Sequence, residues 1–396
     1  FVVAGISLFL IRAAKITPQR TLAKLSRQFL MYLDELHLLN FKNYQEANLR
    51  FSPSVNVLVG KNGSGKTNLL DAIYSLSFTK SAFASSDTYC ILNGQPFFMI
   101  KGKFMKDGRL YELVSSVQTG SKKTFREEGL DYQKLSDHIG KYPVVLIAPD
   151  DVELVRESSE SRRKFFDSII SQLDKTYLEA LMQYNQALKQ RNSLLRLFQE
   201  RGISDWLALE SYDQILIRVG QLIFTRRSSF AEEFLPVFRK YFQFIVGQEE
   251  VTSLEYVSEL KEKSFEEGLL KNRQKDVLLQ RTSFGIHRDD YLFTLGNGDL
   301  KRLGSQGQQK SFVIALKLAQ FEIIEKIKGF KPILLLDDIF DKLDDYRISK
   351  LLSLMKNELG QLFITDARPD RTGELLRSIE TSAAIFSVDK GIITTT

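Results

Sequence analysis

The stretch GKNGSGKT, from Gly60 to Thr67, constrains this chain more than any other part of the sequence. It fits the pattern G-x-x-x-x-G-K-[ST] and lies between an apolar run of β type, Val55–Val59, and a helical run, Asn68–Ile73. Strand, glycine-rich loop and helix in this order are the context expected of a phosphate-binding loop. The glycines let backbone N–H groups converge on phosphate oxygens, and the helix N-terminus adds partial positive charge. The stretch therefore predicts a nucleoside triphosphate site, with a glycine-rich surface turn as the alternative.

The loop also predicts individual roles. Its candidate ligands are Gly60, Lys61, Asn62, Gly63, Ser64, Gly65, Lys66 and Thr67. Lys66 is expected to reach the β- and γ-phosphates of ATP, and the Thr67 hydroxyl is expected to bind Mg²⁺. ATP and Mg²⁺ are therefore the expected cofactors.

A second motif supplies two carboxylates. The apolar run Pro332–Leu336 has the pattern of a buried strand and is followed by Asp337 and Asp338. Asp337 is expected to hold Mg²⁺ through water opposite Thr67, and Asp338 to polarise the attacking water as general base. Lys66, Asp337 and Asp338 are thus the predicted catalytic residues. The alternative is a strand that ends in a solvated acidic turn.

Composition limits the other classes of function. A chain of 396 residues with 43% hydrophobic content can bury a large core and divide into two domains. The single cysteine, Cys90, excludes an internal disulfide and a multi-cysteine metal site, which favours a reducing, cytoplasmic compartment. The formal charge is +6, but residues 1–30 hold five basic residues and no acid, so the rest is nearly neutral. Any nucleic-acid surface must then be a local patch.

Residues 1–31 are interpreted as a leader outside the fold, with Met31 as the natural start. The apolar run Phe1–Ile11 is too short to span a bilayer, although a truncated signal or membrane anchor is the alternative.

The remaining chain divides into a head and an arm. Strand-like runs recur at 32–38, 47–51, 97–104, 110–117 and 143–147. From about Ser158 the texture changes to apolar residues at helical spacing, with strand patterns returning at 254–257 and 291–295. We expect an α/β head with a mixed sheet, formed by residues 32–157 and 276–396. A mostly helical arm, residues 158–275, is inserted into it.

A third motif precedes the second carboxylate strand. Leu303–Lys310 is a small-polar turn before the helical run Ser311–Lys326, and on its own it fits an ordinary helix cap. In its position along the chain it resembles the signature loop of ABC-type ATPases. That resemblance implies a head-to-tail dimer in which Ser305 and Gly307, with Gln308 beside them, contact the γ-phosphate held by the partner. Lys342–Asp344 resembles the D-loop of the same class.

Several blocks in their order along the chain resemble the RecF family, from about Tyr32 to the C-terminus. They are Phe41–Tyr44, Gly60–Tyr74, Pro143–Val145, Pro149–Asp151, Arg162–Arg163, Gly285–Asp290 and Ser305–Gln309. The resemblance implies an ABC-type P-loop ATPase head related to those of Rad50 and SMC proteins. It also implies ATP-driven homodimerisation on single-stranded, gapped or double-stranded DNA, with weak, DNA-stimulated hydrolysis. Partnership with RecR and RecO in loading recombinase at gaps, and roles in DNA replication, repair and the SOS response, are implied as well.

The sequence departs from the family pattern at three places. Ile286 replaces the proline usual in the block Gly285–Asp290, and Thr365–Asp366 offers no switch histidine. No glutamine stands near Pro149–Asp150, where Asp150 is a candidate substitute.

Two questions stay open at this point. Arg162–Lys164 and Arg226–Arg227 either contact DNA phosphates or form a solvated helix face. The alternative function is the ATPase subunit of an ABC membrane transporter. A Rad50-like tether is disfavoured because the arm is too short for a long coiled coil.

Overall fold

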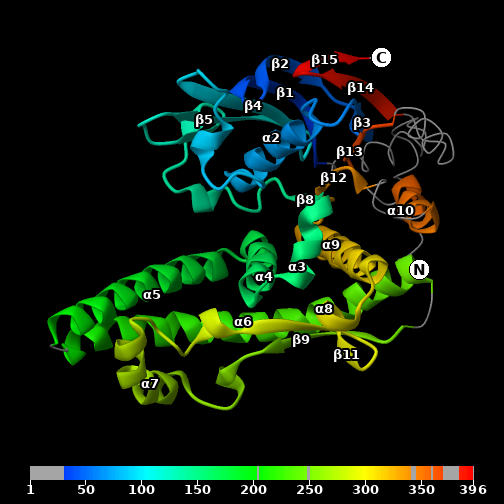
Figure 1. Ribbon diagram of the computed structural model, residues 1–396. Helices are drawn as coiled ribbons and strands as arrows, with labels where there is room; N and C mark the ends of the chain where they lie inside the picture. The colour runs from blue at the N-terminus through cyan, green and yellow to red at the C-terminus, as the bar shows by residue number, and fades with distance from the viewer. Residues whose placement is uncertain are drawn as a thin grey trace, which may run out of the picture.

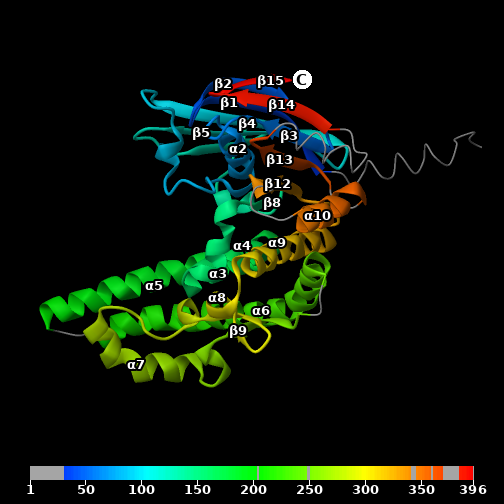
Figure 2. The same ribbon diagram turned by 45° about the vertical axis from the view of Figure 1, so that its right-hand side comes forward.

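The computed structural model describes residues 31–202, 205–247, 250–339, 345–357, 360–368 and 383–395. These residues form two lobes, one above the other in Figures 1 and 2. The upper lobe contains two six-stranded sheets with helix α2 (Lys66–Phe78) packed between them. The predicted leader up to residue 30 and the D-loop-like Lys342–Asp344 lie outside the described residues. No helix in the described part of the chain is long and apolar enough to cross a membrane.

The first sheet of the upper lobe carries both predicted nucleotide motifs. Its order is β15 (Ile392–Thr395), β14 (Ala383–Asp389), β3 (Val55–Val59), β13 (Leu362–Asp366), β12 (Ile333–Leu336) and β8 (Val144–Ile147). All neighbours pair in parallel except β14 and β15. Strands β3, β12 and β8 are buried along their whole length, because a parallel sheet is covered on both faces. The segments after β3 and β12 therefore emerge at the same edge of the sheet.

The second sheet is antiparallel. Its order is β2 (Tyr44–Arg50), β1 (Met31–Phe41), β4 (Phe97–Lys106), β5 (Arg109–Gln118), β6 (Thr124–Glu127) and β7 (Leu130–Asp131). Asp107 and Gly108, both with positive φ, make the turn between β4 and β5. Met31 belongs to β1 and is 2% exposed, so the ordered fold already includes the last residue of the expected leader.

The lower lobe is built on long helices. These are α3 (Glu153–Arg156), α4 (Ser159–Leu173), α5 (Lys175–Arg201), α6 (Trp206–Val246), α7 (Phe265–Leu279), α8 (Leu300–Leu303) and α9 (Gln306–Lys328). A three-stranded sheet of β11 (Gly298–Asp299), β10 (Asp290–Leu295) and β9 (Thr252–Val257) packs on them. Helix α6 continues through Pro236 and packs against both α5 and α9. Helix α10 (Asp345–Asn357) contacts α6.

The division expected at residue 275 is not where the lobes separate. Lys275 lies inside α7, and β10, α8 and α9 remain in the lower lobe (Figure 1). The aromatic core crosses the expected boundary: the Phe312 ring of α9 lies 4.5 Å from that of Phe238 and 5.9 Å from that of Phe242. Because α9 needs this contact to bury its apolar face, we correct the end of the lower lobe to about Lys328.

A buried arginine ties three helices of the lower lobe together. Arg191 of α5 has no exposed surface; its Nε donates to Asp213 of α6 at 2.6 Å, and its Nη1 donates to Asp276 of α7 at 2.7 Å. Both carboxylates are buried as well. We call these three residues the arm network. Removing one partner of a buried ion pair leaves an uncompensated charge in the protein interior and strongly destabilises the fold.

Candidate functional site

The glycine-rich loop connects β3 directly to α2, as the sequence predicts. Gly63 and Gly65 adopt φ values of 78° and 120°, a region that side chains other than glycine rarely enter. A Cβ at Gly60 would lie 2.2 Å from the carbonyl oxygen of Val388, so this position also requires glycine. The loop is therefore shaped by its glycines into the expected cradle.

Lys66 places its ammonium group over the loop. Its Nζ donates to the carbonyl oxygens of Gly60, at 2.9 Å, and Lys61, at 3.3 Å, and the residue is only 3% exposed. A buried cation beside a concave row of backbone groups suits a polyphosphate, whose oxygens can replace the carbonyls as partners.

Thr67 and Asp337 meet at the sheet edge although they are distant in sequence. The Thr67 hydroxyl lies 3.0 Å from both carboxylate oxygens of Asp337. Asp337 is 4% exposed, and burial raises its pKa, while hydrogen bonds from Thr365 and Thr67 oppose the rise. A hydroxyl and a carboxylate are hard oxygen ligands, so this pair fits the Mg²⁺ that accompanies a bound triphosphate.

Asp338 has an unusual backbone conformation, and Thr365 holds it there. Asp338 has a φ of 42°, and its N–H donates to the Thr365 hydroxyl at 2.8 Å. The same hydroxyl donates to Asp337 at 2.8 Å. Thr365 is fully buried near the end of β13, the strand that lies between β3 and β12. From this position its hydroxyl contacts both carboxylate residues. In the sequence this position is notable only for the missing histidine; its contacts depend on sheet order, which the local pattern does not reveal.

We expect Thr365→Val to lower the rate constant of ATP hydrolysis about 10-fold, with ATP affinity changed less than about twofold. Valine keeps the shape but removes a hydrogen bond that orients a buried carboxylate, a loss of about 1–2 kcal/mol. Steady-state kinetics and ATP titrations measure the two quantities. Thr365→Ser is the matched control because it keeps the hydroxyl. Equal rates for the valine and serine variants would contradict this positioning role.

The signature-like loop forms the start of α9. The Ser305 side chain accepts a hydrogen bond from the Gln308 N–H at 3.2 Å, and Gln308 Oε1 accepts one from the Ser305 N–H at 2.9 Å. This reciprocal pair is a capping box. Gln308 also donates to Glu250. Ser305 is exposed and Gly307 is half-buried, so the loop presents a capped helix N-terminus at the surface of the lower lobe.

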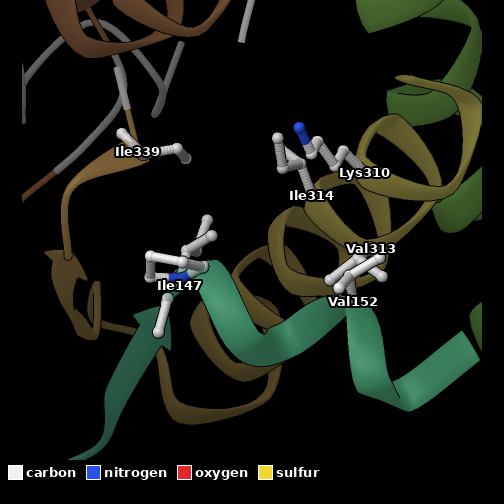
Figure 3. A pocket seen from close by; sticks show the side chains of 8 residues that line it. Ile147, Val152, Lys310, Val313, Ile314 and Ile339 are labelled. Carbon is white, nitrogen blue, oxygen red and sulfur yellow. The ribbon is translucent and has the colours of Figure 1, made fainter. Parts of the chain in front are cut away.

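The two groups of predicted site residues lie in different lobes. The phosphate loop and Asp337 lie in the upper lobe, whereas Ser305 and Gly307 lie in the lower lobe at the beginning of α9 (Figure 1). Between the lobes, the end of β8, α9 and the residue after Asp338 line an apolar pocket. Figure 3 shows the Ile147, Ile314 and Ile339 side chains at this pocket, with Lys310 at its edge. The pocket connects the strand end that carries Asp338 to the helix that carries Ser305.

Two of the arginines considered for DNA contact, one buried and one half-buried, pair with carboxylates of the lower lobe. Arg227 is 2% exposed and pairs with Asp167, at 2.9 Å, and Asp289, at 3.2 Å. Arg162 forms two 2.8 Å hydrogen bonds to Asp290. Because Arg227 is buried and paired, it is neither a phosphate contact nor part of a solvated helix face, the two alternatives that the sequence left open. The partners of both arginines lie far away in the sequence, so the local charge run was misleading.

His287 is also part of the lower-lobe packing. Its Nε2 lies 3.0 Å from the Thr282 carbonyl oxygen, which can only accept, so Nδ1 accepts from the Tyr184 hydroxyl at 2.9 Å. Burial lowers the pKa of His287 to about 4. The ring is therefore neutral near pH 7, with both nitrogens engaged.

Comparison with known proteins decides the family. The DNA replication and repair protein RecF of Flavobacterium johnsoniae is 47% identical over 359 residues, which cover 90% of this chain and 100% of the relative. The protein of the same name from Cytophaga hutchinsonii is 43% identical over 362 residues, covering 91% and 96%. The chain belongs to the RecF family. A family model described as the RecF/RecN/SMC N terminal domain also matches residues 32–135 of this RecF-family chain.

Solved structures agree with the assignment to RecF. A structure of the recombination mediator protein RecF with ATP, in the RecFOR pathway, has a TM-score of 0.84 and 30% identity, covering 93% of this chain and 98% of that one. An Smc head domain with an extended coiled coil, from Pyrococcus furiosus, has a TM-score of 0.53 and 19% identity. This likeness supports the fold and carries no conclusion about function. The predicted RecF-type fold, an ABC-type P-loop head with a helical arm, is therefore confirmed.

Proposed function

We propose that this RecF-family chain binds ATP with Mg²⁺ and hydrolyses it slowly, with DNA stimulating the reaction. The observation that supports this best is the convergence of Lys66, Thr67 and Asp337 at one sheet edge. The relatives are DNA replication and repair proteins, and the solved RecF structure carries ATP. Bound Mg²⁺ would neutralise charge on the phosphates.

The chain's own residues have distinct parts in this proposal. Lys66 and the loop N–H groups bind the phosphates, Thr67 and Asp337 hold the metal ion, and Asp338 orients and deprotonates the attacking water. Burial of Asp337 excludes bulk water and strengthens its interaction with a cation. In the same proposal, the exposed loop at Ser305, Gly307 and Gln308 completes the site of a second copy.

The dimer is proposed to close around DNA, single-stranded, gapped or double-stranded, as a clamp that hydrolysis later releases. We further propose that it acts in the cytoplasm with RecR and RecO, loading recombinase at gaps during replication, repair and the SOS response. The names of the relatives and the RecFOR pathway of the solved structure support this proposal. The two relatives described above are RecF proteins that match over almost their whole length, which favours this proposal over the transporter alternative.

The test of the proposal is ATP-dependent dimerisation. We expect light scattering to detect a dimer with ATP and a monomer with ADP, and Ser305→Arg to abolish the dimer. A long cation at this exposed helix start would occupy the space that a partner's γ-phosphate needs. Gapped DNA should bind only under the conditions that give the dimer.

Two further variants separate steric blocking from loss of the helix cap. Ser305→Ala removes the cap, worth about 1 kcal/mol, without adding bulk. Ser193→Arg adds the same charge at an exposed position of α5. The proposal predicts a dimer in both. A Ser305→Arg protein that dimerises and binds gapped DNA like the unmodified chain would contradict the role of this loop.

A further inference from the structure

Two carbonyl groups of the phosphate loop point away from the cradle into hydrogen bonds with other segments. The Ser64 carbonyl oxygen accepts from Asn43 Nδ2 at 3.0 Å and from the Gly391 N–H at 3.1 Å. The Gly65 carbonyl oxygen accepts from the Tyr44 hydroxyl at 2.9 Å and, as the N-cap carbonyl of α2, from the Leu69 N–H at 3.1 Å. Asn43 and Tyr44 lie at the turn between β1 and β2, and Gly391 lies at the turn between β14 and β15. Two turns from opposite ends of the chain therefore support the loop from behind.

These bonds fix more than the carbonyls. In a trans peptide unit the C=O and the N–H of the next residue point in opposite directions and are held in one plane. Fixing the Ser64 carbonyl therefore fixes the Gly65 N–H, and fixing the Gly65 carbonyl fixes the Lys66 N–H. Both N–H groups then point to the other side of the loop, where phosphate oxygens are expected.

The supporting residues are themselves tightly held. Asn43 Oδ1 accepts from the Asn68 side chain at 2.8 Å, which assigns the Asn43 amide nitrogen to Ser64. A Cβ on Gly65 would lie 2.4 Å from the Asn43 side chain, and a Cβ on Gly391 would lie 2.5 Å from the Asn43 carbonyl oxygen. Tyr44 is fully buried. The three segments meet at a distance that leaves no room for side chains at either glycine.

We propose that Asn43, Tyr44 and the Gly391 N–H are positioning groups of the nucleotide site, which aim the Gly65 and Lys66 N–H groups at the β-phosphate. This inference rests on the proposed ATP binding and adds to it a set of residues outside the loop motif. A loop fixed in its binding conformation does not have to be ordered when the ligand arrives, so affinity is gained without new contacts to the ligand.

The test uses variants that remove single donors. Tyr44→Phe deletes one hydroxyl, and Asn43→Asp keeps the shape but replaces the amide donor with a carboxylate. Tyr142→Phe is the matched control, because its buried hydroxyl donates to Glu127 at 2.6 Å, in a part of the upper lobe away from the loop. The measurements are the Kd of ADP by calorimetry, competition by inorganic pyrophosphate, and the melting temperature without ligand.

We expect the Kd of ADP to rise about 5-fold in Tyr44→Phe and at least about 10-fold in Asn43→Asp, the values that one neutral and one charge-perturbed hydrogen bond give. The inhibition constant of pyrophosphate should rise by the same factors, because pyrophosphate has only phosphate groups to contact. In Tyr142→Phe both constants should stay unchanged even if the melting temperature falls.

Three outcomes decide the question. Equal factors for ADP and pyrophosphate in the two test variants support the inference. The inference is overturned if both folded variants keep the Kd of ADP and the inhibition constant of pyrophosphate of the unmodified chain. It is also overturned if the variants bind ADP more weakly but pyrophosphate equally well. In either case ATP binding by the unmodified chain still stands. If the unmodified chain binds neither ADP nor pyrophosphate, the proposed function itself fails.

Discussion

Replacing Lys66 with arginine should reduce ATP turnover by about 100-fold or more and leave the fold intact. The Lys66 ammonium is a compact charge, almost fully buried over the loop carbonyls of Gly60 and Lys61. A planar, longer guanidinium cannot take that place and still stabilise the charge that develops on the transferred phosphoryl group. A phosphate-release assay in the presence of DNA measures the rate, and the melting temperature checks the fold.

Lys122→Arg is the control for this experiment. Lys122 lies between β5 and β6, outside the loop, and its side chain is exposed, so the substitution makes the same chemical change away from the predicted site. We expect its turnover to stay within about twofold of the unmodified chain. Turnover of the Lys66→Arg protein at the same level would remove the assignment of this loop as the ATP site.

The second large effect concerns stability and involves the arm network. Arg191→Met should lower the free energy of unfolding by about 3–5 kcal/mol, the usual cost of breaking a buried ion pair by removing one partner. The methionine leaves Asp276 without its arginine in a place with no exposed surface. Chemical denaturation followed by circular dichroism measures the change, and the loss should appear in the helical signal of the lower lobe.

Arg196→Met provides the comparison on the same helix. Arg196 is exposed, and its Nε donates to the Asn192 carbonyl oxygen on the same helix, at 3.3 Å. Its replacement should change stability by less than about 0.5 kcal/mol. Similar losses in the two variants would mean that helix propensity, and not the arm network, accounts for the effect.

Local patterns in the sequence were enough to predict much of the fold and its central loop. Strand β3, the loop and α2 fall where the pattern places them, because glycine spacing and apolar runs are decided by neighbouring residues. Thr67 and Asp337 come together as expected, because the ends of parallel strands meet at one edge. The catalytic roles assigned to these residues stay predictions.

What the sequence could not provide depends on contacts between distant segments. Arg227 is part of a basic run in the sequence, yet it is neutralised by Asp167 and Asp289, which lie about 60 residues away on either side. Thr365 gains its position from the order of strands in the sheet. The end of the lower lobe was misplaced because α7 and α9 continue the packing of α6 after the expected boundary. None of these contacts between distant segments can be recognised in a short window of sequence.

The position of β3 in its sheet has a consequence for biosynthesis. Both neighbours of β3 come from late in the chain, β13 from residues 362–366 and β14 from residues 383–389, and Gly391 then touches the loop itself. Synthesis proceeds from the N-terminus, and domains generally fold as units. On the ribosome, β3, which precedes the phosphate loop, therefore has no neighbouring strand to pair with until about 300 further residues have been added. The proposed nucleotide site is therefore completed only after residues 383–391 have been synthesised, and a chain interrupted before them should not bind ATP.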